Sequence, residues 1–519
     1  MNSEQLMKTA SEIRQFKEGG NDSTYRARRS AIATSRRWTR IAFFGLVLAA
    51  AIASAQQGQP APQAVKFKTL VSFDGTDGGN PYSQLVQGVD GQLYGTTAVG
   101  GANGGGNFFK LLPDGSPQIL YSFCAQPNCA DGYGAQLVLG PDGNFYGANG
   151  GGGNTAGGGT VFRISPAGEL KTLYQFCSLP DCADGTNPLG LTLGIDGNFY
   201  GATGGGGTNP ECACGTIFKL TTTGEVTTVY NLGIGQGAPV QFAPVIQATD
   251  GNLYGVTQGP PWGSVYKVTL AGVYTTLYNF CSQSNCSDGK LPQAPLIQAS
   301  DGALYGTTLQ GGNVVGDDSF GIVFKITLDG AFTVLHKFCS QPNCADGDNP
   351  DSGLIQGSDG SFYGTTPRVQ GRGTIFRLTP SGKLTTLYSF DETVYDVFEN
   401  PPLMQRTDGT FYGPEVYGGT ANAQCAAGTC GGLFSLSVGL GPFVQTLPIS
   451  GKVGDTVQIL GNELTNAESV SFNGVPASFQ AESKTLISAT VPAGATSGFV
   501  TVKGANSSLK STARFQVRQ

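Results

Sequence analysis

Ten of the twelve cysteines form five local pairs, each with four residues between its members. In four pairs the cysteines frame a loop that ends in Asp-Gly, as in YSFCAQPNCADG at residues 121–132. Two such loops could bind zinc together, or each pair could close a disulfide. The pairs are Cys124 and Cys129, Cys177 and Cys182, Cys281 and Cys286, Cys339 and Cys344, and Cys425 and Cys430. A bridge between the remaining Cys212 and Cys214 would be strained, so another partner or a free thiol is an open alternative.

The Asp-Gly loops also carry four aspartates at equivalent positions. Calcium binds through carboxylate and carbonyl oxygens, so it is the metal that these aspartates could hold, and we expect no other cofactor. Each of these equivalent positions supplies a single carboxylate, however, and no spacing resembles an EF-hand. The alternative role is a turn in which Asp accepts backbone N–H bonds and Gly takes a positive φ. The four aspartates are Asp131, Asp184, Asp288 and Asp346.

Paired carboxylates are the other group that could do chemistry, because most glycosidases use two of them. Candidates are Asp74 with Asp77, Asp317 with Asp318, and an acidic loop that contains the catalytic candidates Asp391, Asp396 and Glu399. Acidic residues are common on solvated loops, and Trp262 is the only tryptophan among the repeats described below. We therefore expect a protein that is not an enzyme, with a carbohydrate-active hydrolase or lyase as the alternative.

His336 is the only histidine, so a Ser-His-Asp triad or a histidine-rich metal site would have to be built on it. It stands where related segments have tyrosine, which favours a structural substitution. The chain has no Gly-x-Ser-x-Gly elbow, phosphate-binding loop or zinc-protease motif.

The elements that position these residues are repeats. The hexapeptide DGQLYG at Asp90 returns six times, as DGNFYG, DGNLYG, DGALYG, DGSFYG or DGTFYG, and an element such as GTIFKL follows each copy. A third element, such as TLYSF, follows six copies, and an apolar segment precedes every Asp-Gly. Four strands in each of seven units near 50 residues predict an all-β fold, a seven-bladed β-propeller.

A displaced segment indicates a closed ring. TLVSF at Thr69–Phe73 precedes the first hexapeptide, whereas the last unit stops after GGLFSLS without a third element. If TLVSF pairs as the outer strand of the last blade, no blade is incomplete and no sheet edge is exposed. A stacked solenoid, the alternative, gives no reason for this displacement.

The connections should differ between the two faces of the propeller. Tight Asp-Gly and Pro-Asp-Gly turns lie on one face, and the variable loops, with every cysteine, lie on the other. Ligands tend to bind at the face that carries such variable loops. The hexapeptide tyrosines could stack on sugars, but a residue present in every unit is more typical of packing between blades. They are Tyr94, Tyr146, Tyr200, Tyr254, Tyr305, Tyr363 and Tyr412.

Composition and the N-terminus predict export. Residues 1–55 hold 9 of the 30 basic and 4 of the 36 acidic residues, which leaves an acidic remainder that argues against nucleic acid as a partner. Arginines precede the apolar run IAFFGLVLAAAIASA, which ends at Ala53-Ser54-Ala55 and is typical of a secretory signal peptide after a long leader. An uncleaved anchor is the alternative; the mature chain should have no membrane span. In an exported chain the cysteine pairs should be disulfides.

The repeat ends before a different pattern. SGKVGDTVQILG, VSFNGVPASF and ISATVPAGATSGFVTV closely resemble the IPT/TIG family of immunoglobulin-like domains, although GNEL at Gly461–Leu464 departs from that family's Gly-x-x-Phe. The units with DGxLYGTT, GTIFKL and TLYSF resemble the GloVer tandem repeat of exported bacterial proteins, which implies an exported propeller and no particular activity.

These observations predict a signal segment at 1–55, a linker at 56–65, the propeller at 66–438, a linker at 439–447 and an immunoglobulin-like domain at 448–519. The expected function is a binding or adhesion module outside the cell, at its surface or in the periplasm. The expected ligand is an extracellular polysaccharide or protein bound at the loop-rich face, and we expect a monomer. The connection from the outer strand of one blade to the inner strand of the next lacks cysteines where it enters the first, fourth and seventh blades. We expect these three connections to determine which ligand binds.

Overall fold

The computed structural model describes residues 64–153, 157–236, 243–259, 261–315, 318–367, 373–390, 402–416, 422, 425 and 429–518. By their contacts, all described residues belong to one compact unit. The predicted signal segment and the candidates Asp317, Asp391, Asp396 and Glu399 lie outside the described residues. No helix in the described ranges is long and apolar enough to cross a bilayer.

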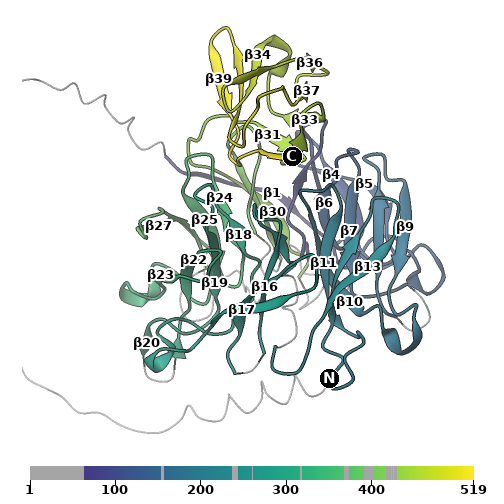
Figure 1. Cartoon of the computed structure of the whole chain (residues 1–519), viewed down its shortest axis with the longest axis vertical. Coiled ribbons are helices and arrows are strands. Elements are labelled where there is room, and N and C mark those ends of the chain that lie inside the picture. The colour runs from purple at the N-terminus through teal and green to yellow at the C-terminus, as the bar shows by residue number, and fades with distance from the viewer. Residues whose placement is uncertain are drawn as a thin grey trace, which may run out of the picture. The chain divides into compact units, whose positions relative to one another are not determined.

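The described part of the chain is all-β, with strands, turns and a few single-turn 3-10 helices (Figure 1). Its repeats form seven four-stranded antiparallel sheets, as expected for propeller-like repeats. We number the sheets 1 to 7 in the order of their hexapeptides. Apolar and β-branched residues favour the strands, and a glycine at positive φ closes each Asp-Gly turn, such as Gly91 at 76°.

The first four sheets each use four consecutive strands. Sheet 1 has β2 (Val86–Gln87), β3 (Leu93–Thr96), β4 (Asn107–Leu111) and β5 (Pro117–Ser122). Sheet 2 has β6 (Gln136–Leu139), β7 (Phe145–Asn149), β8 (Thr160–Ile164) and β9 (Leu170–Gln175). Sheet 3 has β10 (Thr186–Leu193), β11 (Phe199–Gly205), β12 (Thr216–Leu220) and β13 (Val226–Asn231). Sheet 4 has β14 (Ile246–Gln247), β15 (Leu253–Thr257), β16 (Ser264–Val268) and β17 (Tyr274–Asn279).

The last three sheets include one small insertion and one strand from the start of the chain. Sheet 5 has β18 (Ile297–Gln298), β19 (Leu304–Thr308), β22 (Ile322–Ile326) and β23 (Phe332–Lys337), with the hairpin β20 (Val314–Val315) and β21 (Asp318–Ser319) inserted. Sheet 6 has β24 (Ile355–Gln356), β25 (Phe362–Thr366), β26 (Thr374–Leu378) and β27 (Leu384–Ser389). Sheet 7 has β28 (Met404–Gln405), β29 (Phe411–Glu415), β30 (Gly432–Ser437) and β1 (Lys66–Ser72).

Strand β1 completes the last sheet. It pairs antiparallel with β30 from Lys66 opposite Ser437 to Ser72 opposite Gly432. The prediction that TLVSF supplies the missing outer strand is therefore confirmed. The pairing covers the edge of β30, which would otherwise present unpaired backbone groups.

Hydrophobic clusters join each sheet to the next, and the last sheet to the first. Most hexapeptide tyrosines lie in these clusters: the ring centroids of Tyr94 and Phe145 of the following sheet are 4.5 Å apart, and those of Tyr363 and Phe411 are 4.3 Å apart. The cluster that joins sheet 7 to sheet 1 contains Phe73, directly after β1. The tyrosines thus pack sheet against sheet, as predicted, and are not an exposed ring for sugar stacking.

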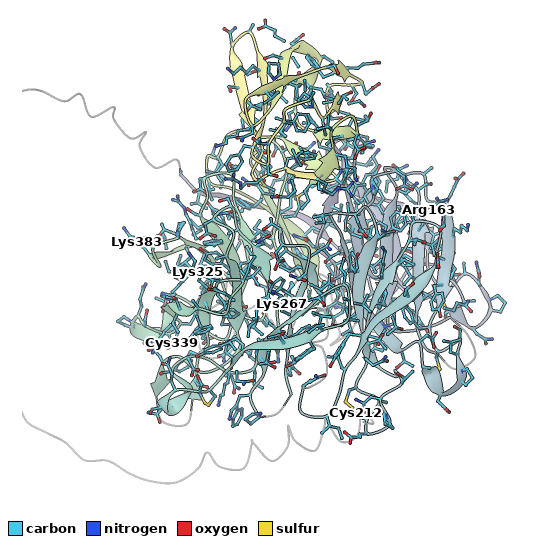
Figure 2. The ribbon with its side chains drawn as sticks, viewed as in Figure 1. Arg163, Cys212, Lys267, Lys325, Cys339 and Lys383 are labelled. Carbon is cyan, nitrogen blue, oxygen red and sulfur yellow. A yellow bond between two sulfur atoms is a disulfide. The ribbon has the colours of Figure 1, made fainter. Side chains whose placement is uncertain are left out.

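The buried tyrosines keep a polar partner. In six repeats the phenol donates to the aspartate that opens its own hexapeptide, as in Tyr94 to Asp90 at 2.9 Å. A cation opposite the tyrosine on the next strand pairs with the same carboxylate, as in Lys110 to Asp90 at 2.9 Å; Figure 2 labels three of these cations. They are Lys110, Arg163, Lys219, Lys267, Lys325 and Arg377. Sheet 7 has Ser435 at this position, and Arg406 pairs with Asp408 instead.

Glutamines at the end of five innermost strands connect neighbouring sheets. Gln298 of sheet 5 accepts from the Thr249 backbone N–H of sheet 4 at 2.9 Å, and its amide donates to Gly302 O at 2.9 Å. Gln87 of sheet 1 accepts from the Thr407 N–H of sheet 7 at 3.0 Å, which bonds the first repeat to the last. Gln247, Gln356 and Gln405 make the equivalent bonds. Sheets 2 and 3 have Leu139 and Leu193 at this position.

Residues 445–518 form two further four-stranded sheets around one core. The first has β31 (Gln445–Leu447), β33 (Thr456–Leu460), β37 (Leu486–Thr490) and β36 (Phe479–Ala481). The second has β35 (Val475–Ala477), β34 (Ala467–Phe472), β38 (Val500–Gly504) and β39 (Ser507–Lys510). β32 (Ser450–Lys452) pairs parallel with β40 (Gln516–Arg518). Their side chains alternate between the core and solvent, as strands with one buried face require.

Candidate functional site

The connections of the repeats are of two kinds, as predicted. The turns at the hexapeptide aspartates and those between the third and fourth strands are tight and glycine-containing, with hydrogen bonds such as Gly91 N to Gly88 O at 2.9 Å. The other connections hold all the cysteines and the variable segments. We call the part of the surface that these longer connections form the loop face.

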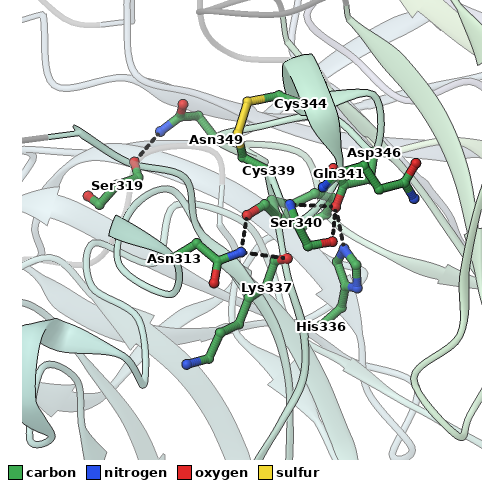
Figure 3. Close-up of a disulfide and its surroundings, with 11 residues drawn as sticks. Asn313, Ser319, His336, Lys337, Cys339, Ser340, Gln341, Cys344, Asp346 and Asn349 are labelled. Carbon is green, nitrogen blue, oxygen red and sulfur yellow. Dashed lines mark hydrogen bonds and ion pairs between the residues drawn. A yellow bond between two sulfur atoms is a disulfide. The ribbon is translucent and has the colours of Figure 1, made fainter. Parts of the chain in front are cut away.

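Each Asp-Gly cysteine loop is organised around its buried aspartate. Asp346 accepts from the Ser340 and Gln341 N–H groups at 3.1 Å each and bonds His336 Nε2 at 3.0 Å (Figure 3). Burial alone would raise the pKa of Asp346, but the bonds from His336 and Ser340 lower it below its ordinary value. His336 therefore replaces a tyrosine in the same hydrogen bond.

The other three loops repeat this geometry with a tyrosine. Asp131, Asp184 and Asp288 accept from Tyr121, Tyr174 and Tyr278 at 2.7 to 2.8 Å and from two backbone N–H groups each. These partners are donors, which supports the turn role of the aspartates. The described residues contain no group of three or more His, Cys, Asp or Glu that could hold a metal ion. Calcium binding at the four aspartates stays a prediction.

Six disulfides are present, between the members of the five local pairs and between Cys212 and Cys214. Figure 2 shows Cys212 and Cys339 in loops outside the sheets. Each Asp-Gly loop also contains a 3-10 turn that ends at its second cysteine: η2 (Pro127–Cys129), η3 (Pro180–Cys182), η4 (Ser284–Cys286) and η5 (Pro342–Cys344). These loops are thus stapled turns in the described structure.

Asp74 and Asp77, a candidate carboxylate pair, share a turn. The Asp74 N–H donates to Asp77 Oδ1 at 2.9 Å, and Asp74 accepts from the Thr76 hydroxyl and N–H. The bonds from Thr76 lower the pKa of Asp74, whereas burial raises that of Asp77. Of the pair Asp317 and Asp318, only the backbone of Asp318 in β21 is described.

A cleft on the loop face spans three consecutive sheets. It has a volume of about 310 Å³, at the lower end of the roughly 300–1,000 Å³ of small-molecule sites. Sheet 1 contributes Tyr82 and Thr96, among others. The remaining lining residues are Ser83, Ala98, Tyr133, Gly134, Ala135, Gln136, Ala148, Asn149, Gly150, Gly151, Asn187, Pro188 and Leu189. None of these described lining residues is charged.

Glycines let side chains approach the backbone in this cleft. A Cβ at Gly150 would lie 1.7 Å from Asn187 Oδ1, and a Cβ at Gly151 would lie 2.9 Å from the Tyr133 ring. Asn149 connects two segments that line the cleft. Its side-chain NH2 donates to Tyr133 O at 2.9 Å, and its Oδ1 accepts from Gly151 N at 3.2 Å. The glycine-rich connection after β7 therefore shapes the cleft.

Asn187 differs from its equivalents in the other repeats. Asn80 and Asn349 have the same left-handed backbone, with φ of 51° and 47° against 56° for Asn187. Their buried amides donate to backbone carbonyls of the preceding sheet, as in Asn349 to Leu309 O at 2.9 Å. The exposed Asn187 makes no side-chain hydrogen bond within the described residues, so its amide is available to a ligand.

The sequence pattern did not identify this cleft. Tyr82 and Ser83 follow a connection without cysteines, where we predicted the residues that determine which ligand binds. Tyr133, Gln136 and Asn187, in contrast, follow cysteine loops. A signal existed: after the shared Asp-Gly, the four cysteine loops continue with four different residues. These are Tyr133, Thr186, Lys290 and Asp348.

Fold and cleft together define an all-β repeat protein with a small, uncharged site on its loop face. The family model described as the Gloeobacter/Verrucomicrobia repeat matches residues 59–260 and 245–446. The chain belongs to this repeat family. No curated protein matches it.

The solved structures to which this chain is similar include the extracellular domain of a putative hybrid two-component system, BT4673, from B. thetaiotaomicron. It is 11% identical with a TM-score of 0.44, and the match covers 88% of this chain and 60% of that one. PorZ, a surface component of the type-IX secretion system of Porphyromonas gingivalis, is 14% identical with a TM-score of 0.44, over 86% of this chain and 60% of PorZ. This chain thus spans less than two thirds of either structure. No conclusion about function follows from similarities this low.

Proposed function

We propose that this protein is an exported binding module that takes its ligand in the loop-face cleft. The cleft itself carries the proposal: it combines aromatic, amide and hydroxyl side chains at positions that differ between repeats. Residues common to all repeats, such as the hexapeptide tyrosines, are occupied by packing between sheets. Only the variable positions can distinguish one ligand from another.

The proposal includes a rigid support for the cleft. The seven sheets act as the blades of a closed propeller, since each packs on the next and β1 completes the last. Residues 448–519 act as an immunoglobulin-like domain of the IPT/TIG type, which the two sheets around one core support. Such a scaffold fixes three loops relative to one another, and a pre-formed site binds without a large ordering cost.

Export is part of the same proposal. Six disulfides are typical of proteins from oxidising compartments, and the N-terminal segment has the composition of a signal peptide. The ligand is then extracellular, a polysaccharide or a protein, and the protein acts as a monomer outside the cell, at its surface or in the periplasm.

A binding screen with product analysis tests this function. The purified protein is exposed to immobilised polysaccharides and extracellular proteins, and the ligands are then examined for cleavage. We expect retention of an intact ligand, and Ala98→Trp should abolish it because a large side chain fills the cleft. Ala125→Trp, on an exposed cysteine loop outside the lining, is the matched control and should bind normally.

The screen also separates binding from catalysis. Release of shortened oligosaccharides, lost when Asp391, Asp396 or Glu399 is neutralised, would replace the binding function by the hydrolase or lyase alternative. Retention that Ala98→Trp leaves unchanged would place the ligand elsewhere. Binding that survives removal of calcium by a chelator would leave the four loop aspartates as turn residues only.

A further inference from the structure

The chemistry of the cleft narrows the class of ligand. The described residues that line it include no charged side chain, so a charged ligand would lose hydration there without gaining a counter-ion. Its walls alternate apolar groups, such as Ala135, Ala148 and Pro188, with amides and hydroxyls. A ligand that fits has one apolar surface and several uncharged groups that both donate and accept hydrogen bonds.

Tyr133 supplies an aromatic surface to such a ligand. Its side chain is 37% exposed although it lines the cleft, and its ring lies against Gly151, where a Cβ would approach within 2.9 Å. Six of the hexapeptide tyrosines, in contrast, are almost fully buried and bonded to aspartate, as with Tyr146 at 0%. The Tyr133 hydroxyl makes no hydrogen bond within the described residues, so both its ring and its hydroxyl are accessible.

Two amides complete the polar side of the cleft. The side chains of Gln136 and Asn187 line it, and neither amide hydrogen bonds to any of the described residues. An amide offers two donors and an acceptor, which matches a pair of neighbouring hydroxyls. The inner-strand glutamines of other sheets, such as Gln298, use the same groups to connect neighbouring sheets.

The backbone around these three side chains is fixed before any ligand arrives. Cys129 O accepts from the Gly132 and Gly153 N–H groups at 2.8 and 3.0 Å, which ties the disulfide loop before Tyr133 to the glycine-rich connection. Thr96 Oγ1 donates to Ala135 O, which ties sheet 1 to the beginning of β6. Fixed walls favour a ligand with a rigid ring over a flexible chain.

Taken together, these features lead us to propose that the loop-face cleft binds a neutral glycan. The Tyr133 ring packs on the C–H face of a sugar ring, and the Gln136 and Asn187 amides bond its hydroxyls. This inference rests on the proposed function and adds the ligand class. None of the described lining residues carries a carboxylate, so the glycan is held among them without cleavage by a carboxylate pair.

Calorimetric titration of the purified protein tests the glycan class. The probes are cellohexaose, xylohexaose and maltohexaose, with hexagalacturonate as an acidic counterpart. We expect at least one neutral hexasaccharide to bind and the acidic one to bind at least about tenfold more weakly. Affinity for the neutral probe should change less than about twofold between low and high salt, because screening acts on charges.

Variants locate the contact. Tyr133→Ala should weaken neutral binding about tenfold or more, whereas Tyr133→Phe should stay within about threefold, because it keeps the ring. Asn187→Ala should weaken it about tenfold, because the sugar hydroxyl loses its partner. Trp262→Ala is the control: this tryptophan is 39% exposed with Lys290 5.0 Å from its ring, and it does not line the cleft, so binding should not change.

The outcomes distinguish this inference from the proposed function. Failure of every neutral probe overturns the glycan class, yet leaves the binding function intact if Ala98→Trp still abolishes retention of another ligand in the screen. Neutral binding that Trp262→Ala removes and Tyr133→Ala leaves unchanged overturns the assignment to this cleft. Thermal unfolding of each variant establishes that the protein remains folded.

Discussion

At the scale of single residues, the same hydrogen bonds recur wherever a repeat needs a fixed loop. The loop aspartates each bind one ring and two backbone N–H groups, and His336 takes the place of the ring donor in one loop. The pattern explains why the only histidine needs no catalytic role. It also implies that tyrosine can replace His336, because tyrosine makes the equivalent bond in the other three loops.

Replacing His336 tests this interpretation. His336→Tyr should keep the free energy of unfolding within about 0.5 kcal/mol of the natural protein, because three equivalent loops use tyrosine. His336→Phe should lower it by about 1–3 kcal/mol, because the buried Asp346 loses a partner. Denaturant unfolding measures both. Equal losses in the two variants would contradict the shared role.

The loop aspartates also set a pH dependence. Burial opposes ionisation of Asp184, Asp288 and Asp346, but hydrogen bonds to the carboxylates outweigh it and hold each pKa below the ordinary 3.8. Their contribution to the free energy of unfolding is therefore fully present above about pH 4. It is lost as the pH falls through the lowered pKa values that these carboxyl groups have in the folded protein. In acid titrations followed by circular dichroism, the unfolding midpoint of His336→Phe should lie at higher pH than that of His336→Tyr. An unchanged midpoint would contradict the contribution of this bond.

At the scale of elements, the inner-strand glutamines connect sheets that share no strand. Gln298→Leu should destabilise the protein by about 1–3 kcal/mol, because Thr249 N and Gly302 O lose their partner. Gln118→Leu, on the exposed face of β5, is the matched control and should change stability by less than about 0.5 kcal/mol. A comparable loss in both variants would mean that the bonds between sheets contribute nothing specific.

The sequence predicted the elements far better than the site. Seven hexapeptides and a displaced TLVSF were enough to predict the repeats, the pairing of β1 with β30 and the packing role of the tyrosines, because each depends on a periodic pattern. The cleft depends on three loops with no common motif. Its position follows from how far each loop bends, which glycines such as Gly150 and Gly151 permit but do not specify.

At the scale of the whole molecule, strand β1 closes the chain of sheets on itself. Lys68→Cys combined with Ser435→Cys should form a disulfide on mild oxidation, because these residues are direct partners in the β1–β30 ladder. Lys66→Cys with Ser435→Cys is the control and should form much less, because Lys66 lies opposite Ser437, two residues out of register. Proteolysis and mass mapping detect the link. Preferential linking of the control pair would contradict the closure.

The central claim is that a ligand binds in the cleft between sheets 1, 2 and 3. The most direct measurement is hydrogen–deuterium exchange of the protein with and without a bound ligand from the screen. We expect slower exchange confined to peptides that contain residues 82–83, 133–136, 148–151 and 187–189, with the ligand recovered intact. Slower exchange at residues 391–401 or at the tight turns instead, or a cleaved ligand, would contradict it.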